Sequence, residues 1–278
     1  MQVNFVHVAA VAAMGLTMGC GTMPSASTPM TVPDLSRVSA EQWQRLGQRR
    51  LLFAHQSVGG NVLDGVAALL KDHPGIPVRV VEIASAAEVR GPGLYHKKVG
   101  TNGQPDSKLA EFDTLTRDAF ASAETGDVAM LKFCYADMKP HVDPDSLFAA
   151  YQREVEAVRR AHPGLTIVHV TMPLWVDTGI IDHVGTIILG KATPIRAINA
   201  ERHRYNQLVR AAYRGREPFF DLAAYEATRA DGSVTDVRYK GQALPSLAKE
   251  WTTDGGHLND AAKRRLAEAF LVTLAQLP

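Results

Sequence analysis

The stretch that decides the fold is RRLLFAHQSVGGNVLDGVAALL, residues 49–70. Its first part, RRLLFAH (49–55), is a short apolar run of the kind that forms a strand covered on both faces. In the second part Val62, Val66 and Leu69 recur at the three- and four-residue steps typical of a helix. A strand that passes at once into a helix is the repeating unit of an α/β fold with a parallel sheet.

The same alternation continues along the chain on both sides of this stretch. Further strand-like runs are VRVVEIA (78–84), DVAMLKF (127–133), TIVHVTM (166–172) and PFFDLAA (218–224). Helical patterns occupy residues 143–164, which begin acidic and end basic, and residues 259–277. Because parallel strands are joined by right-handed crossovers, the pattern predicts a three-layer αβα sandwich with a five-stranded parallel sheet, in one domain over residues 36–278.

Two Gly- and Pro-rich segments, residues 91–112 and 227–256, interrupt the alternation. Long loops in a compact domain are usually functional or disordered. In open α/β sheets, ligands bind at the carboxyl ends of the strands. We therefore expect both segments to reach that edge of the sheet.

Composition excludes several classes of protein. The 278 residues are 46% hydrophobic with a net charge of +1, so the chain is neither disordered as a whole nor a general nucleic-acid binder. Its two cysteines cannot form a disulfide scaffold or a cysteine-based zinc site. The ten histidines show no metal-binding spacing and no Gly-rich phosphate motif follows a strand, so we expect neither a metal nor a nucleotide cofactor.

Residues 5–19 form an uncharged, mostly apolar run that ends at Cys20. At about 1.5 Å per residue this run is shorter than the ~30 Å membrane core, which favours a secretory signal over a spanning helix. It resembles a bacterial lipoprotein signal, which implies export, lipidation of Cys20 and membrane attachment through that lipid. Residues 1–20 would be the signal and residues 21–35 a flexible tether. An ordinary cleaved signal and a buried N-terminal helix are the alternatives.

The first candidate catalytic residue is Ser57, in the segment HQSVGGN that joins the first strand to its helix. Free backbone N–H groups at a helix N-terminus can hold a developing negative charge, and glycines nearby allow close approach. Ser57 is therefore a candidate nucleophile. The alternative is that it only caps the helix.

A nucleophilic serine needs a base and a carboxylate that orients it. In TTDGGHLND, Asp254 stands three residues before His257 with two glycines between them, directly before the last helix. This spacing lets both side chains project from one edge. A turn-capping aspartate and an exposed loop histidine are the alternative interpretation.

Together, the serine after the first strand and the terminal D-x-x-H resemble the SGNH hydrolase (GDSL-like esterase) superfamily. The resemblance covers essentially the whole chain after the signal and implies its flavodoxin-like fold. It also implies the roles of the three residues: Ser57 as nucleophile, His257 as general base and Asp254 as orienting acid.

The middle of the chain departs from that family. His55-Gln56-Ser57 stands where the family has Gly-Asp-Ser, and Cys134-Tyr135-Ala136-Asp137 stands where it has Gly-x-Asn-Asp. Ala136 therefore replaces the Asn that donates to the oxyanion. The loss of one such donor typically costs about 10²–10³ in rate unless another group replaces it.

The loop KKVGTNG offers a replacement donor. We expect the Asn102 amide to serve, with a backbone N–H of Gly100 or Gly103 as second donor; a plain Asn-Gly turn is the alternative. His55 could line the pocket or be a structural histidine. Asp137 would order the loops around the site, or cap a helix.

Other residues near the expected site have less specific interpretations. Tyr135, Trp175 and Trp251 could stack on a sugar ring or simply pack, and Asp221 is a second candidate for the orienting acid. Cys134 ends a buried strand and is expected to be inert.

These residues predict an exported serine esterase that cleaves acyl, above all O-acetyl or short-chain, esters of a glycan or related envelope component. Two alternatives remain open: an O-acyltransferase with the same residues, and a degenerate fold that only binds envelope glycans. The oligomeric state cannot be read from the sequence.

Overall fold

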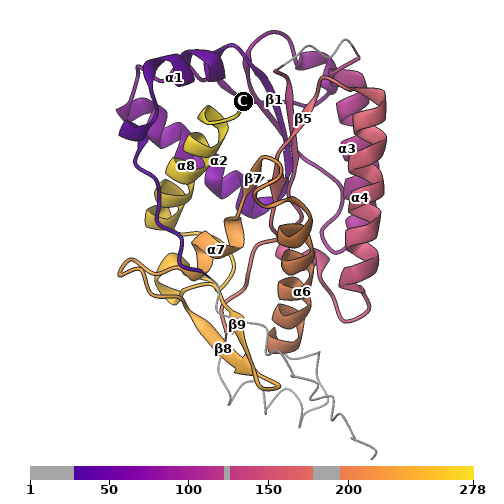
Figure 1. Ribbon diagram of the computed structural model, residues 1–278, viewed down its shortest axis with the longest axis vertical. Coiled ribbons are helices and arrows are strands. Elements are labelled where there is room, and N and C mark those ends of the chain that lie inside the picture. Colours follow the sequence, from indigo (N-terminus) through magenta and orange to yellow (C-terminus); the bar gives the residue numbers. More distant parts are fainter. Residues whose placement is uncertain (1–27, 122–125, 178–194) are drawn as a thin grey trace, which may run out of the picture.

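The computed structural model describes residues 28–121, 126–177 and 195–278 (Figure 1). The expected signal and its Cys20 lie outside the described residues. Within the described part, no helix is both long and apolar enough to cross a membrane.

A parallel sheet forms the centre of the domain. Its strand order is β2-β3-β1-β4-β5, and every neighbouring pair is parallel. The strands are β2 (Val80–Glu82), β3 (Gly93–Lys98), β1 (Arg50–His55), β4 (Val128–Leu131) and β5 (Thr166–Ile167). After the single residue Val168 the chain continues as β6 (His169–Val170), which pairs in parallel with β7 (Phe219–Phe220). The predicted α/β class with a five-stranded parallel sheet is confirmed.

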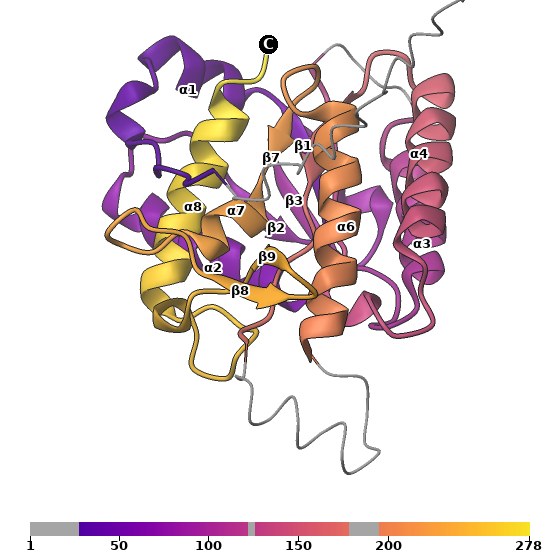
Figure 2. The same ribbon diagram turned by 60° about the horizontal axis from the view of Figure 1, so that its bottom comes forward.

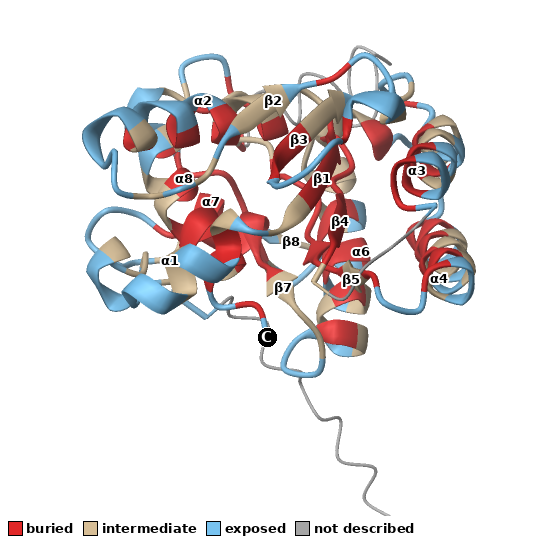
Figure 3. Cartoon of the chain, turned by 90° about the horizontal axis from the view of Figure 1, so that it is seen from above, coloured by how far each residue is buried: buried red, intermediate tan, exposed pale blue. Residues whose placement is uncertain are grey.

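Helices cover both faces of the sheet, as Figures 1 and 2 show. One side carries α1 (Ala40–Gly47), α2 (Ser57–Asp72), α7 (Leu222–Ala227) and α8 (Asp260–Ala275). The other side carries α3 (Pro105–Ala119), α4 (Pro144–Ala161) and α6 (Ile195–Tyr213). The strands β1 and β4 between these layers are buried (Figure 3), which is the condition that produces near-continuous apolar strands.

The sequence interpretation of residues 91–112 as a loop was wrong. This segment contains β3, which lies between β1 and β2, and it contains the first turns of α3. Only residues 99–104 form the connecting loop. The loop with Gly100 and Gly103 therefore directly follows β3.

Two further expectations are corrected. The fifth predicted strand, 218–224, is reduced to β7 because α7 begins at Leu222, and β7 pairs with β6 rather than with the five-stranded sheet. The segment 227–256 is not all loop, because it contains the antiparallel hairpin of β8 (Asp236–Tyr239) and β9 (Gln242–Pro245).

The described part of the expected tether, residues 28–35, lies against the domain. Met30, Val32 and Leu35 pack on the core between the sheet and α8, and the Met30 N–H donates to Thr228 Oγ1 (3.0 Å). These residues of the expected tether are therefore in contact with the domain.

Candidate active site

Ser57 is the first residue of α2 and is half-buried. The N-cap position belongs to Gln56, whose side chain does not cap the helix. Its amide instead donates to the carbonyls of Val99 (2.7 Å) and Gly100 (3.0 Å), in the loop after β3. Ser57 is therefore not a capping residue. The first turn of α2 keeps N–H groups that a ligand can accept from.

Asp254 and His257 form a close pair before α8. Asp254 Oδ2 lies 2.5 Å from His257 Nδ1, and Oδ1 accepts the backbone N–H groups of Gly256 (2.9 Å) and His257 (2.8 Å). The two backbone N–H groups, followed by the imidazole, lower the pKa of Asp254 well below its usual value. An ionised Asp254 holds the proton on Nδ1 and leaves Nε2 as an acceptor.

The two glycines of this motif have separate structural reasons. Gly255 has φ of +94°, which L side chains rarely adopt. At Gly256 a Cβ would lie 2.3 Å from the Trp175 ring, so the ring packs directly on the backbone beside His257. The Val176 N–H donates to the Gly255 carbonyl (2.8 Å) and fixes the same turn to the segment after β6.

The helix that carries Ser57 is locked against the helix that follows His257. At Gly65 of α2 a Cβ would lie 2.2 Å from the Lys263 carbonyl of α8, so only glycine permits this close crossing. Asn61 Oδ1 accepts the Leu258 N–H (3.1 Å) and joins α2 directly to the His257 segment. Asn61 thus links the helix that carries Ser57 to the segment that carries His257.

Tyr135 lies at the meeting point of Ser57 and His257. Its phenol oxygen is 3.4 Å from His257 Nε2, and the Ser57 hydroxyl is near enough to act on the phenol, whose pKa it lowers as a donor. The sequence suggested only ring stacking or packing for Tyr135. Its contact with His257 joins residues 122 positions apart, which no local pattern reveals.

Asp137 holds the loops on this side of the site. One oxygen accepts the Gly103 N–H (2.9 Å), and the other accepts the Cys134 N–H (2.7 Å) and binds the fully buried Lys108 ammonium (2.6 Å). A buried carboxylate with an ammonium and two backbone donors is well satisfied. Lys108, which the sequence analysis did not single out, also donates to Asn102 Oδ1 (3.0 Å).

The glycines of the β3–α3 loop are poor oxyanion donors as they stand. The Gly100 N–H donates to Glu111 Oε2 (2.7 Å) and the Gly103 N–H to Asp137. Asn102 is exposed, and because Lys108 occupies its Oδ1, its amide NH₂ remains the group that can donate to a ligand. Of the three expected donors in this loop, Asn102 fits best.

His55 is a buried structural histidine in this arrangement. Its side chain contacts the Gln56 carbonyl through Nδ1 (3.0 Å) and His96 Nδ1 through Nε2 (3.1 Å). Burial, the main cause, lowers the pKa of His55 to about 3. A Cβ at Gly59 would lie 2.4 Å from His55 Cβ, so this glycine makes room for the ring.

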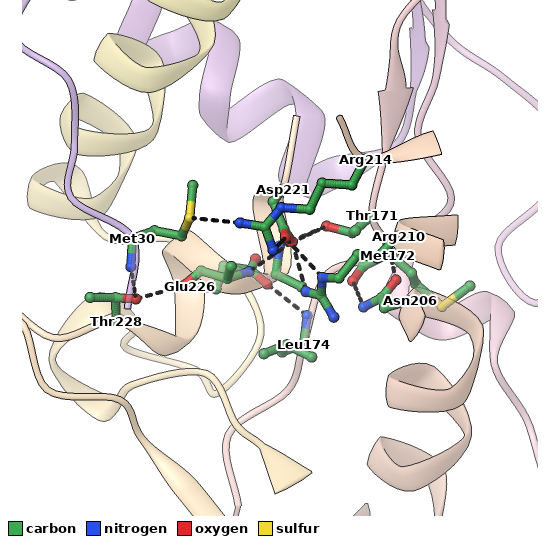
Figure 4. Close-up of polar contacts among 12 residues, drawn as sticks. Met30, Thr171, Met172, Leu174, Asn206, Arg210, Arg214, Asp221, Glu226 and Thr228 are labelled. Carbon is green, nitrogen blue, oxygen red and sulfur yellow. Dashed lines mark hydrogen bonds and ion pairs between the residues drawn. The ribbon is translucent and has the colours of Figure 1, made fainter. Parts of the chain in front are cut away.

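Asp221 is occupied elsewhere and does not act on His257. It caps α7, accepts from Thr171 Oγ1 (3.3 Å) and pairs with Arg210 at 2.7 and 2.8 Å (Figure 4). Trp251 is also buried, with its indole N–H on the Thr228 carbonyl (2.8 Å). Both residues stabilise the fold around α7.

No family model matches the chain. No curated protein matches it. Similar solved structures include the lipase/acylhydrolase from Enterococcus faecalis, with 10% identity and a TM-score of 0.43 over 82% of this chain and 95% of that one.

Two other similar structures belong to proteins whose names refer to envelope components. A peptidoglycan O-acetylesterase shows 15% identity and a TM-score of 0.42 over 67% of this chain, which spans 47% of that structure. The periplasmic domain of a lipopolysaccharide acetyltransferase from Salmonella ser. Paratyphi A shows 10% identity and a TM-score of 0.41 over 82% and 84%. At these levels of similarity, any assignment of function rests on the site itself.

Proposed function

We propose that the protein is a divergent SGNH-type serine esterase that hydrolyses acyl esters. The observation that carries this proposal is the position of the Asp254–His257 pair, joined at 2.5 Å and tied by Asn61 to the helix that begins with Ser57. Nucleophile, base and orienting acid then belong to one rigid unit. Each of them comes from a turn that the fold holds in place.

The proposed reaction follows the chemistry of these groups. Ser57 Oγ attacks the ester carbonyl as its proton passes to the His257 base, whose imidazolium Asp254 stabilises. The carbonyl oxygen becomes an oxyanion, which we expect the Ser57 N–H at the start of α2 and the Asn102 amide to stabilise. Collapse of this intermediate releases the alcohol, and water then cleaves the acyl-enzyme by the same steps in reverse order.

We propose O-acetyl or other short acyl esters of an envelope glycan as the substrate class. The lipoprotein-like signal supports this proposal because it would deliver the domain to the cell envelope. Trp175 and Tyr135 beside His257 support it as well, because aromatic rings suit the apolar face of a sugar. No metal or nucleotide is required by this mechanism.

The test is hydrolysis of p-nitrophenyl acetate and butyrate by the purified chain without residues 1–20. We expect Ser57→Ala to lower kcat by about 10⁴-fold or more. Ser146→Ala is the matched control, because Ser146 also lies in the first turn of a helix, α4, and its backbone N–H, which the substitution keeps, donates to Asp143 (2.8 Å). Full activity of Ser57→Ala would contradict the assignment.

Two other functions are separated by the same experiment. An O-acyltransferase would form the acyl-enzyme but pass the acyl group to an added sugar faster than to water. A glycan-binding module would show no turnover at all, and the occupied Gly100 and Gly103 N–H groups are the observation that favours it.

Export is a separate proposal that rests on residues 1–20. If Cys20 is lipidated, labelled palmitate will be incorporated into the full-length chain and the protein will sediment with membranes. Cys20→Ser should remove the label and release the protein; retention of both would contradict the lipoprotein proposal.

A further inference from the structure

Tyr135 occupies the position between nucleophile and base. It begins the short helical turn Tyr135–Asp137 after β4, at the carboxyl edge of the sheet. Its phenol oxygen lies 3.4 Å from His257 Nε2, and the Ser57 hydroxyl is near enough to act on the phenol as a donor. Among the described residues, the hydrogen-bonding partner of His257 Nε2 is therefore Tyr135.

The donors along this chain of groups all point in one direction. His257 Nδ1–H donates to ionised Asp254, so Nε2 accepts, and the group that donates to it is the Tyr135 O–H. The phenol oxygen still has lone pairs, which can accept from the nearby Ser57 O–H. Burial, the main cause, raises the pKa of Tyr135 to about 12, so the phenol keeps the proton that it must donate.

The Tyr135 ring is fixed from several sides. Arg202 Nε donates to the Tyr135 carbonyl (3.0 Å), and its guanidinium lies 5.9 Å from the ring centre. Trp175 packs edge-on with ring centres 4.7 Å apart, and Trp175 itself rests on Gly256. A phenol held in this way keeps its hydroxyl between Ser57 and His257.

We propose that Tyr135 is a catalytic residue that relays the proton between Ser57 and His257. This inference rests on the proposed esterase function. As Ser57 Oγ bonds to the carbonyl carbon, its proton moves to the Tyr135 oxygen while the Tyr135 proton moves to His257 Nε2. The carbonyl π electrons move onto oxygen, Tyr135 stays neutral and His257 becomes an imidazolium.

The return step balances in the same way. When the tetrahedral intermediate collapses, the bond between the carbonyl carbon and the alcohol oxygen breaks. The leaving alkoxide takes the Tyr135 proton, and the His257 imidazolium gives its Nε2 proton back to Tyr135. In deacylation a water molecule attacks the acyl carbon, and its proton passes through Tyr135 to His257. When the second intermediate collapses, the bond from the acyl carbon to Ser57 Oγ breaks, and the proton returns through Tyr135 to Ser57 Oγ. Two protons therefore move together in each transfer, whereas a direct Ser57–His257 contact moves one.

The test is Tyr135→Phe with p-nitrophenyl acetate, because this change removes only the hydroxyl. General acid–base groups typically contribute 10²–10⁴-fold, so we expect kcat to fall by about 10²–10³-fold with KM within about threefold. The matched control is Tyr151→Phe, which removes another buried phenol bonded to a histidine (Tyr151 to His169 Nδ1, 2.8 Å) on the opposite face of the sheet. Its kcat should stay within about twofold.

A proton inventory separates the relay from a phenol that only stabilises the oxyanion. In mixtures of H₂O and D₂O, the wild-type rate should curve with deuterium fraction as two protons move, and the residual rate of Tyr135→Phe should be linear. Wild-type kcat in Tyr135→Phe, or a linear wild-type inventory, overturns the relay. If Ser57→Ala is inactive and Tyr135→Phe is not impaired, the relay alone fails; if Ser57→Ala keeps its activity, the proposed function fails and the relay falls with it.

Discussion

Two aspartates near the carboxyl ends of strands pair with basic side chains, yet their surroundings differ. The Asp254 side chain is 51% exposed and pairs with the half-exposed His257, whereas Asp221 is 2% exposed and pairs with Arg210. Asp221 contacts Arg210, Arg214, Thr171 and the first turn of α7 (Figure 4). Asp254 instead binds His257 Nδ1, and the Nε2 atom of His257 faces the Tyr135 hydroxyl.

The difference distinguishes a structural carboxylate from a candidate catalytic one. A fully satisfied buried ion pair such as Asp221–Arg210 stabilises one conformation and leaves nothing to react with a ligand. The Asp254–His257 pair leaves His257 Nε2 able to take and return a proton. If this comparison is correct, substitution at the two aspartates will affect different properties.

The largest effect is expected at the active-site aspartate. Asp254→Asn removes the charge that holds the His257 tautomer, so kcat should fall by about 10²–10⁴-fold. Because the side chain is half-exposed, the unfolding midpoint in urea should change little. Steady-state kinetics on p-nitrophenyl acetate measure the first quantity, and a large loss of stability with normal kcat would reverse the assignment of the two aspartates.

Asp221→Asn should have the opposite signature. It leaves Arg210 without its buried carboxylate partner, which typically destabilises a protein by about 3–5 kcal/mol. Urea unfolding followed by circular dichroism should show this loss, and kcat of the protein that remains folded should stay within about threefold. Loss of kcat without loss of stability would make Asp221 part of the catalytic machinery.

A smaller, pH-dependent effect is expected from His55. Burial lowers the pKa of His55 from 6.5 to about 3, so below pH 6.5 the unfolded chain binds a proton that the folded chain does not. Stability should therefore fall as the pH drops, by about 1.4 kcal/mol per pH unit between pH 6.5 and 4.5 for this one group.

His169 and His203 also have pKa values lowered by burial, to about 4. The dependence of wild-type stability on pH therefore reflects proton uptake by several histidines on unfolding. The contribution of His55 is isolated by His55→Gln, which should reduce the slope by about one proton in urea unfolding at pH 6.5, 5.5 and 4.5. An unchanged slope would mean that His55 is charged in the folded state or open to solvent.

The sequence identified the elements whose signals are local. The first strand, its helix and the Ser57 turn lie within 22 residues, and the terminal D-G-G-H needs only a backbone that two glycines allow. Helix α4 was evident because its sequence begins acidic and ends basic, and in the structure Asp143 caps it. For these parts, short-range patterning and tertiary packing agree.

Other features depend on contacts that no local pattern encodes. Strand β3 has the sequence GLYHKK after Gly91 and Pro92, which is typical of a loop, but hydrogen bonds from β1 and β2 on both sides make it a strand. The contact of Tyr135 with His257 and the bond of Asn61 to Leu258 join distant segments. Each of these contacts forms only when the folded sheet brings the segments that follow its strands close together.

The most direct test of the central claim is covalent labelling of the serine. A fluorophosphonate should modify the wild-type chain at a single residue, and peptide mapping by mass spectrometry should place the phosphonyl group on Ser57. Labelling should be lost in Ser57→Ala and strongly slowed in Asp254→Asn. Modification at another residue, or no labelling of the folded wild-type protein, would contradict Ser57 as the nucleophile.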